Sequence, residues 1–156
     1  MRVHIGSDHA GFATKAAIAE QLRKLGFEVV DHGASSYDAG DDYPGFCIAC
    51  AQGVVADEAA GSEAIGVVLG GSGNGEQLAA NLVPGARAVL VTHRDLAILG
   101  RQHNNANIIA IGARFTAPEF AFELVRTFLE TPFSQDPRHV RRLQQMADFE
   151  ATSQSR

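Results

Sequence analysis

The sequence predicts an α/β protein with an open, parallel, five-stranded sheet of the doubly wound, Rossmann-like kind and helices on both faces, in three αβα layers. Short apolar runs alternate five times with longer segments that carry apolar residues at helical spacing. The run 65–69 is apolar throughout, which is typical of a strand buried on both faces of a parallel sheet. A length of 156 residues suits a single domain over 1–156, and no internal repeat divides it.

The first elements follow from this alternation. A short apolar strand is expected over 2–6. The segment 12–25 has apolar residues at helical spacing, and Gly26 follows it as a natural C-cap. A second strand is expected over 27–31. The stretch 33–40 is rich in Gly, Ser and Asp and is interpreted as a loop.

The middle of the chain continues in the same order. A helix over 44–56 opens with a proline, whose fixed φ suits the first helical turn. The strand 65–69 then runs straight into a glycine-rich loop. A helix over 76–82 and a fourth strand over 87–91 follow this loop.

The C-terminal part adds a helix over 94–101, a fifth strand over 108–111 and a helix over 118–129 with one apolar face. A final helix over about 137–150 is polar and rich in Arg. Its thin apolar stripe consists of Val140, Leu143, Met146 or Ala147, and Phe149. Because so thin a stripe packs poorly on its own domain, we expect this helix to pack on a partner subunit of a homo-oligomer.

Composition excludes several classes of protein. The formal net charge is −5, and no basic run precedes the C-terminal end, so no nucleic-acid partner is expected. No apolar run is long enough to cross a membrane, and no signal peptide precedes the first strand. Cys47 and Cys50 cannot form a disulfide framework, which favours a cytoplasmic location. They lie in an apolar helix without a second ligand pair, so we expect buried thiols rather than a zinc or redox site.

Polar, reactive side chains follow the strands at the edge where doubly wound sheets bind ligands. They occupy the segments 7–11, 70–76, 92–93 and 112–114. The strands themselves are apolar, so this placement indicates a site carried by loops on a rigid scaffold.

The loop 70–76 is the strongest of these features. Its four glycines let the backbone approach a ligand closely, and the N–H groups at the start of the next helix suit an oxyanion or a phosphate. Ser72 adds a hydroxyl donor, and Glu76 could act as a base. A tight turn without a ligand is the alternative, but such a turn needs fewer glycines. The spacing completes neither a dinucleotide-binding motif nor, at 6–11, a P-loop.

Asp8 and His9 follow the first strand, where they could hold a sugar hydroxyl and move a proton. Asp8 as a helix cap beside a solvated His9 is an equally good interpretation. The polar stretch 103–107 could be an asparagine turn or a substrate-binding segment. The only basic grouping near these edges consists of Arg114, Arg138, His139, Arg141 and Arg142. Arginine binds phosphate through its planar fork, although a solvated helix face would account for the last four.

Five separated motifs resemble those of the ribose-5-phosphate isomerase B family, in order and at matching intervals over nearly the whole chain. They are Gly6-Ser7-Asp8-His9-Ala10-Gly11, Asp42-Tyr43-Pro44, Gly70 to Glu76, Arg101-Gln102-His103-Asn104-Asn105 and Arg138-His139. The wider family also contains galactose-6-phosphate and allose-6-phosphate isomerases. The resemblance implies a doubly wound fold, no metal or organic cofactor, and a homodimer, or else a tetramer, with active sites shared between subunits.

One departure bears on the mechanism. Many family members have a cysteine base in the glycine loop, where this chain has Ser72. A subgroup that resembles actinobacterial enzymes has Ser there and Glu four residues on, as in Glu76 here. A serine hydroxyl is too weak an acid to act as the base unaided, whereas a carboxylate can remove a proton α to a carbonyl.

The resemblance implies an aldose–ketose isomerase that interconverts ribose 5-phosphate and ribulose 5-phosphate through a cis-enediolate. Glu76 would transfer the proton, and Asp8 and His103 would open the sugar ring. The oxyanion would be bound by Ser72 and the backbone of Gly71, Gly73, Asn74 and Gly75. The phosphate would be bound by His9, Arg114, Arg138 and Arg142, and the sugar hydroxyls by Asn104.

Other functions remain open at this point. The substrate could be a tetrose phosphate, such as erythrulose 4-phosphate or erythrose 4-phosphate, or a 6-phosphate of allose or galactose. A sugar-phosphate-binding subunit or sensor is the non-enzymatic alternative, and a nucleotide-binding module is a third. The presence of both Glu76 and the pair Asp8–His9 favours a self-sufficient enzyme.

Overall fold

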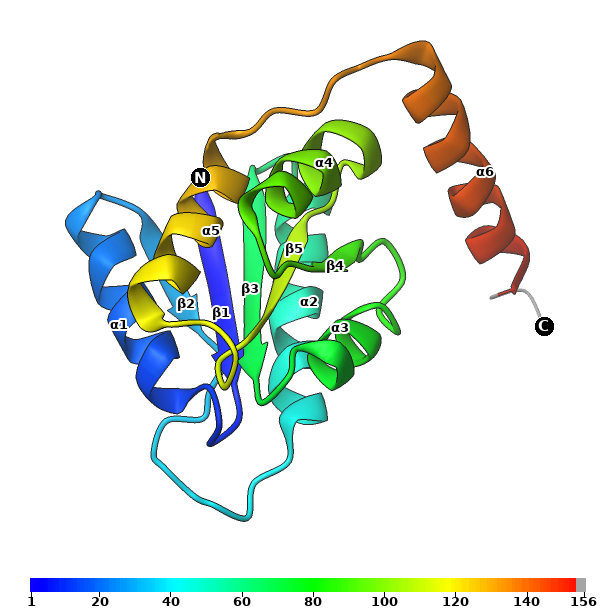
Figure 1. Ribbon diagram of the computed structural model, residues 1–156. Coiled ribbons are helices and arrows are strands. Elements are labelled where there is room, and N and C mark those ends of the chain that lie inside the picture. The colour runs from blue at the N-terminus through cyan, green and yellow to red at the C-terminus, as the bar shows by residue number, and fades with distance from the viewer. Residues whose placement is uncertain (154–156) are drawn as a thin grey trace.

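The computed structural model describes residues 1–153 and confirms a five-stranded parallel sheet with helices on both faces (Figure 1). The strands are β1 (Arg2–Ser7), β2 (Glu28–Asp31), β3 (Ala64–Gly70), β4 (Ala88–Leu90) and β5 (Ile108–Gly112). The helices are α1 (Phe12–Lys24), α2 (Tyr43–Ala59), α3 (Asn74–Ala80), α4 (Arg94–Asn104), α5 (Pro118–Glu130) and α6 (Pro137–Ser153). None of the helices within the described range is long and apolar enough to cross a bilayer.

The order of the strands, β2-β1-β3-β5-β4, fixes the position of the site. From β1 the chain turns outward to β2 on one side, and from β3 it continues to β4 and β5 on the other. The order therefore reverses between β1 and β3, whose parallel register pairs Ser7 with Leu69 at their carboxyl ends. Ligands bind at such a switch point in doubly wound sheets. The loops that leave β1 and β3 consequently start side by side.

Two apolar clusters hold the layers together. Alternate side chains of β3 face opposite ways, so Val67 and Leu69 join one cluster and Val68 the other. The first cluster includes side chains of α1, α4 and α5, and the second those of α2 and α3. Each face of the sheet is thus covered by helices (Figure 1), which accounts for the uninterrupted apolar run in β3.

Two of the differences from the predicted helix boundaries bear on candidate site residues. Helix α3 begins at Asn74 rather than 76, because Gly73 takes a left-handed φ of 83° and serves as its N-cap. Glu76 therefore lies inside the first turn. Helix α4 continues to Asn104, past the expected end at 101, and stops where Asn105 adopts a φ of 42°. Of the stretch 103–107, His103 and Asn104 therefore belong to the last turn of α4, and the left-handed Asn105 begins the turn that was one of the two alternatives.

The segment between β2 and α2 crosses the carboxyl edge of the sheet, and its start is held by a buried lysine. Lys15, on α1, is 3% exposed. Its Nζ donates to Asp31 Oδ1 at 2.6 Å and to the carbonyl of Ala34 at 2.8 Å. An ammonium out of water needs such partners, so these contacts fix where the loop begins.

Helix α6 stands out from the rest of the fold (Figure 1). Of its described residues, only His139 is buried. The apolar side chains of Val140, Met146 and Phe149 are 44%, 60% and 74% exposed. Glu150 accepts a hydrogen bond from the backbone N–H of Gly85 at 3.0 Å. The apolar stripe expected from the sequence is therefore left uncovered within the chain.

A polar cluster lies between β1 and α2. The ring of His4, 4% exposed, contacts His32 through Nδ1 at 2.8 Å and Asp57 Oδ2 through Nε2 at 2.9 Å. Arg2 donates to the other oxygen of Asp57 at 2.7 Å. Gly53 of α2 packs directly on this cluster, where a methyl group would collide with the His4 ring and come within 3.0 Å of His32. Glycine in mid-helix is therefore required by close approach here.

Replacing Gly53 with Ala should lower the free energy of unfolding by about 1–3 kcal/mol, because the new methyl group must displace a buried hydrogen-bonded ring. Urea denaturation measures the change. Gly45→Ala is the matched control in the same helix, since a Cβ there meets nothing within 4 Å. It should leave stability unchanged or raise it by up to about 1 kcal/mol. Equal effects of the two substitutions would contradict this account.

Candidate active site

A pocket of about 520 Å³ lies at the switch point of the sheet. Its walls come from the loops after β1, β3 and β5 and from the start of α2. The lining residues are Asp8, His9, Ala10, Tyr43, Gly71, Ser72, Gly75, Glu76, Arg114 and Phe115. The sequence analysis placed most of these side chains at this edge, but it did not assign Tyr43 or Phe115 to the site.

Glu76 is the most deeply buried acid of the pocket, with 3% exposure. Its carboxyl group lies directly against Gly70, where any side chain would occupy the same space. Its Oε2 has no hydrogen-bond partner among the described residues. Burial therefore raises the pKa of Glu76, and the nearby charge of Asp8 acts in the same direction, while backbone N–H groups at the start of α3 oppose them.

A carboxyl group with these properties suits proton transfer near neutral pH. A base works best when its pKa lies close to the pH of the reaction, and an ordinary glutamate is too weak a base for that. The free Oε2 can receive a proton without first losing a hydrogen bond. The geometry thus favours Glu76 as the proton-transferring group of this pocket.

The glycine loop brings its backbone close to neighbouring side chains. Ser72 Oγ accepts hydrogen bonds from the backbone N–H of Asn74 at 3.3 Å and from its Nδ2 at 3.2 Å. A Cβ on Gly75 would collide with the ring of Tyr43, and one on Gly71 would come within 3.2 Å of Arg114 Nη1. Two of the glycines thus make room for pocket side chains, an arrangement beyond what a plain turn requires.

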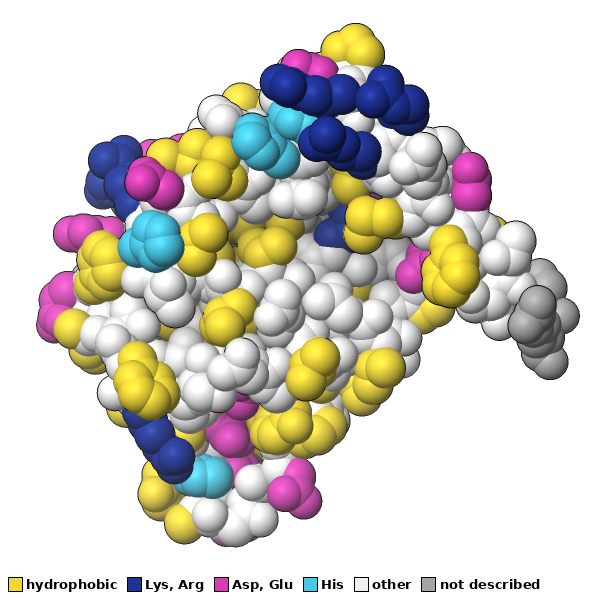
Figure 2. Space-filling model, turned by 45° about the vertical axis from the view of Figure 1, so that its right-hand side comes forward, with side chains coloured by type: hydrophobic (Ala, Val, Ile, Leu, Met, Phe, Trp, Pro, Cys, Tyr) yellow, Lys and Arg dark blue, Asp and Glu magenta, His cyan; other side chains and the backbone are white. Residues whose placement is uncertain are grey.

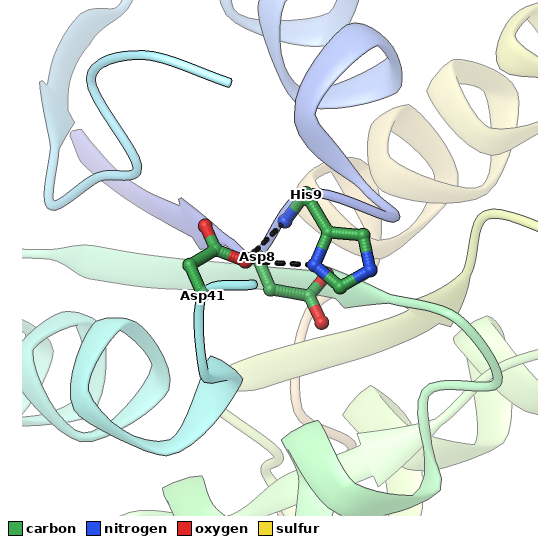
Figure 3. A group of neighbouring side chains, drawn as sticks. All are labelled: Asp8, His9 and Asp41. Atoms are coloured by element: carbon green, nitrogen blue, oxygen red, sulfur yellow. Dashed lines mark hydrogen bonds and ion pairs between the residues drawn. The ribbon is translucent and has the colours of Figure 1, made fainter. Parts of the chain in front are cut away.

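Asp8 and His9 have different partners (Figure 3). Asp8 Oδ1 accepts from the backbone N–H groups of Ala10 at 2.9 Å and Gly11 at 3.4 Å, so it caps the turn before α1. Asp41 Oδ1 accepts from the backbone N–H of His9 at 2.9 Å and contacts its ring Nδ1 at 2.8 Å. The solvated His9 considered from the sequence was therefore wrong, because the ring is held by a second loop.

Sequence reasoning did not single out Asp41. It lies in a polar loop, where an aspartate is usually solvated, and only its position next to Asp42-Tyr43-Pro44 could have drawn attention to it. Its contact with His9 joins residues 32 positions apart, which no local pattern reveals.

The described residues include one group with three potential metal ligands, namely Asp8, His9 and Asp41, whose ligand atoms lie within 4.8 Å of one another. The Nδ1 of His9, however, lies 2.8 Å from Asp41 Oδ1, which is a hydrogen-bond distance. A ring nitrogen that carries this proton has no lone pair for a metal. These residues therefore fit a hydrogen-bonded dyad better than a metal site.

Four of the candidate residues do not reach the pocket within one chain. His103 and Asn104 end α4 next to the amino end of β5, and Arg138 and Arg142 lie in the first turns of α6. The ring centroids of His103 and His139 lie 4.2 Å apart, with the rings tilted by 34°. Burial lowers the pKa of His139, and the charges of His103, Arg138 and Arg142 lower it further, so these groups form one cluster. Figure 2 shows Lys and Arg side chains gathered beside His at the end of the molecule where α6 begins.

The two cysteines are free and buried, as expected. Burial is the main cause of a raised pKa at both thiols, to about 12 for Cys50. Cys47 is close enough for the charges of Glu76 and Asp8 to add to the effect. Neither thiol can act as the nucleophile or base of this pocket.

A family model described as ribose/galactose isomerase matches residues 3–146. The chain belongs to this family. It is 51% identical to the ribose-5-phosphate isomerase B of Mycolicibacterium paratuberculosis. The match extends over 155 residues, which are 99% of this chain and 95% of the relative. It is 49% identical to the enzyme of that name from Mycobacterium tuberculosis, over 99% of this chain and 93% of the relative.

A solved structure of another relative is also closely similar. Ribose-5-phosphate isomerase B from Mycoplasma genitalium, crystallised with bound ribulose 5-phosphate, superposes with a TM-score of 0.89 at 36% identity, covering 96% of both chains. The resemblance inferred from the five motifs is thus confirmed at the level of the family and the fold.

The carboxyl group of Glu76 should titrate above the ordinary glutamate value of about 4.5, because burial disfavours its charged form. Carbon-detected NMR of labelled glutamate side chains would measure this pKa, with the same signal in the urea-unfolded chain as the reference. Asp8→Asn should lower it, since a neighbouring negative charge is removed. A native value at or below that of the unfolded chain would show that the carboxyl group is better solvated than its surroundings indicate.

Proposed function

We propose that this member of the family is a ribose-5-phosphate isomerase, an intramolecular oxidoreductase that interconverts ribose 5-phosphate and ribulose 5-phosphate. The observation that carries the proposal is the carboxyl group of Glu76, buried in the pocket with one oxygen free. The names and the bound ketose phosphate of the relatives support a small phosphorylated sugar as the substrate.

Glu76 transfers the proton in this mechanism. Its carboxylate removes the C2 proton of the open-chain aldose, and the electron pair moves to the C1 carbonyl to form a cis-enediolate. The same carboxyl group returns the proton to C1, while the proton of the C2 hydroxyl passes to the C1 oxygen, so that C2 becomes the carbonyl and C1 the alcohol. Ser72 and the backbone N–H groups of Gly71, Gly73 and Gly75 stabilise the developing oxyanion. The Asn74 N–H already donates to Ser72 Oγ, so it supports the loop rather than the substrate.

The other roles are divided between two ends of the chain. Asp8 assists ring opening, and His9 and Arg114 bind the phosphate at the pocket. His103, Asn104, Arg138 and Arg142 reach the substrate only from a second subunit, His103 for ring opening, Asn104 for the sugar hydroxyls and the arginines for the phosphate. A homodimer with shared sites would also cover the apolar stripe of α6. The free thiols are consistent with the reducing conditions of the cytoplasm.

Glu76→Gln should lower kcat by roughly 10³-fold or more with KM little changed, because it removes the base but keeps the shape of the pocket. A coupled assay with ribose 5-phosphate measures both constants. The native pKa of Glu76 is raised, so its ionisation costs stability as the pH rises. The variant should therefore be at least as resistant to thermal unfolding at pH 8 as the wild type.

Glu119→Gln makes the same chemical change at an exposed position of α5 and should leave both constants unchanged. Near-normal turnover by Glu76→Gln would rule out Glu76 as the base. A large loss of thermal stability in that variant would instead point to a structural role.

Arg138→Ala should mainly raise KM, because it removes a phosphate contact supplied by the partner subunit. Mixing it with Glu76→Gln under conditions that exchange subunits tests the shared site. Half of the resulting dimers would be mixed, with one intact site of two. At a substrate concentration near the wild-type KM, where Arg138→Ala alone turns over slowly, activity should therefore recover to about one quarter of the wild-type value. No gain above the sum of the separate variants would mean that each chain builds its own site.

A further inference from the structure

We propose that Asp41 is a positioning residue of this site, which fixes the ring of His9 and maintains it as the cation that binds the substrate phosphate. The inference rests on the proposed function, because it names a device by which the same pocket accepts a phosphorylated sugar. It concerns a residue outside the five family motifs and a contact between two loops.

The geometry of the contact leaves the His9 ring one orientation. Asp41 Oδ1 accepts from the backbone N–H of His9 at 2.9 Å and contacts ring Nδ1 at 2.8 Å. The ring also meets the edge of Tyr37, with centroids 6.4 Å apart. Figure 3 shows the second ring nitrogen on the side away from Asp41. That nitrogen, Nε2, is the one left to serve a ligand in the pocket that His9 lines.

The charges around the pocket explain why a cation is needed at this position. Of the described residues that line it, only His9 and Arg114 are basic, while Asp8 and Glu76 are acidic. With a neutral imidazole, a phosphate dianion would meet two carboxyl groups and only one guanidinium from this chain, before any arginine of a second subunit is counted. A charged His9 gives the phosphate a second cationic group from the same chain, in a protein whose net charge is −5.

Some of the groups around His9 raise its pKa, and others lower it. The hydrogen bond to Asp41 is the largest influence and raises the pKa of His9, and the charge of Asp8 adds to it. Partial burial and the charge of Arg114 lower it, but the net direction is upward. The second oxygen of Asp41 is buried without a hydrogen-bond partner among the described residues. The negative charge of Asp41 is therefore directed mainly at His9.

The first test is the titration of the His9 ring, followed by NMR of the imidazole signals in the whole protein. In the wild type, His9 should titrate above the ordinary histidine value of about 6.5. Asp41→Asn should lower that value, because an amide can still accept the hydrogen bond but carries no charge. The matched control is Asp38→Asn, which removes a charge from the exposed part of the same loop and should leave the His9 titration unchanged.

The second test is the binding of inorganic phosphate at pH 7.5, measured by calorimetry. Asp41→Asn should weaken it roughly tenfold, and Asp38→Asn should not. In the coupled assay, Asp41→Asn should raise KM for ribose 5-phosphate more at pH 8 than at pH 6, with kcat little changed. A residue that merely holds the loop would lower thermal stability and affect both pH values alike.

Two results would overturn the proposal. One is a wild-type His9 that titrates at or below 6.5, a measurement that does not depend on any variant. The other is an unchanged His9 titration in folded Asp41→Asn protein. Both measurements are made without turnover, so they remain distinct from the proposed function. Wild-type protein that binds phosphate through a charged His9 but does not convert ribose 5-phosphate would refute the assigned substrate and leave the role of Asp41 intact.

Discussion

The parallel pairing of β1 with β3 is the constraint on which the rest of this molecule depends. It sets Ser7 opposite Leu69, so the chain leaves both strands at the same level of the sheet. Helices on both faces hold this pair in place through two separate apolar clusters. The acid of one loop and the acid–imidazole pair of the other can then face the same pocket without contributing to the core.

Burial shifts the pKa values of Glu76 and His9 in opposite directions. At Glu76 it withdraws solvent from a carboxyl group and makes it a stronger base, an effect that depends on Gly70 having no side chain. At His9 the unfavourable effect of partial burial is overcome by a neighbouring carboxylate. The pKa of the carboxyl group and that of the imidazole are therefore both raised, the first by burial and the second by the hydrogen bond to Asp41.

Much of this could be predicted from the sequence, because strand runs, helical spacing and glycine-rich loops are local patterns. Such patterns were enough to predict that the glycine loop with Glu76 lies at the binding edge of the sheet and that Cys47 and Cys50 are buried thiols. The insertion of β5 between β3 and β4 does not, since strand order depends on packing of the whole chain. The early start of α3 depends on a left-handed Gly73, and the contact of Asp41 with His9 spans two loops.

The loop between β2 and α2 is tied down at both ends by charged groups, at Lys15 near its start and at His9 near its end. Between these ties, residues 35–40 are exposed, and Tyr37 reaches the His9 ring. Substitutions or insertions there meet little of the core, so we expect this stretch to tolerate sequence change beside the pocket. Relatives that act on sugars of different size could diverge in this stretch while keeping the proton-transfer group unchanged.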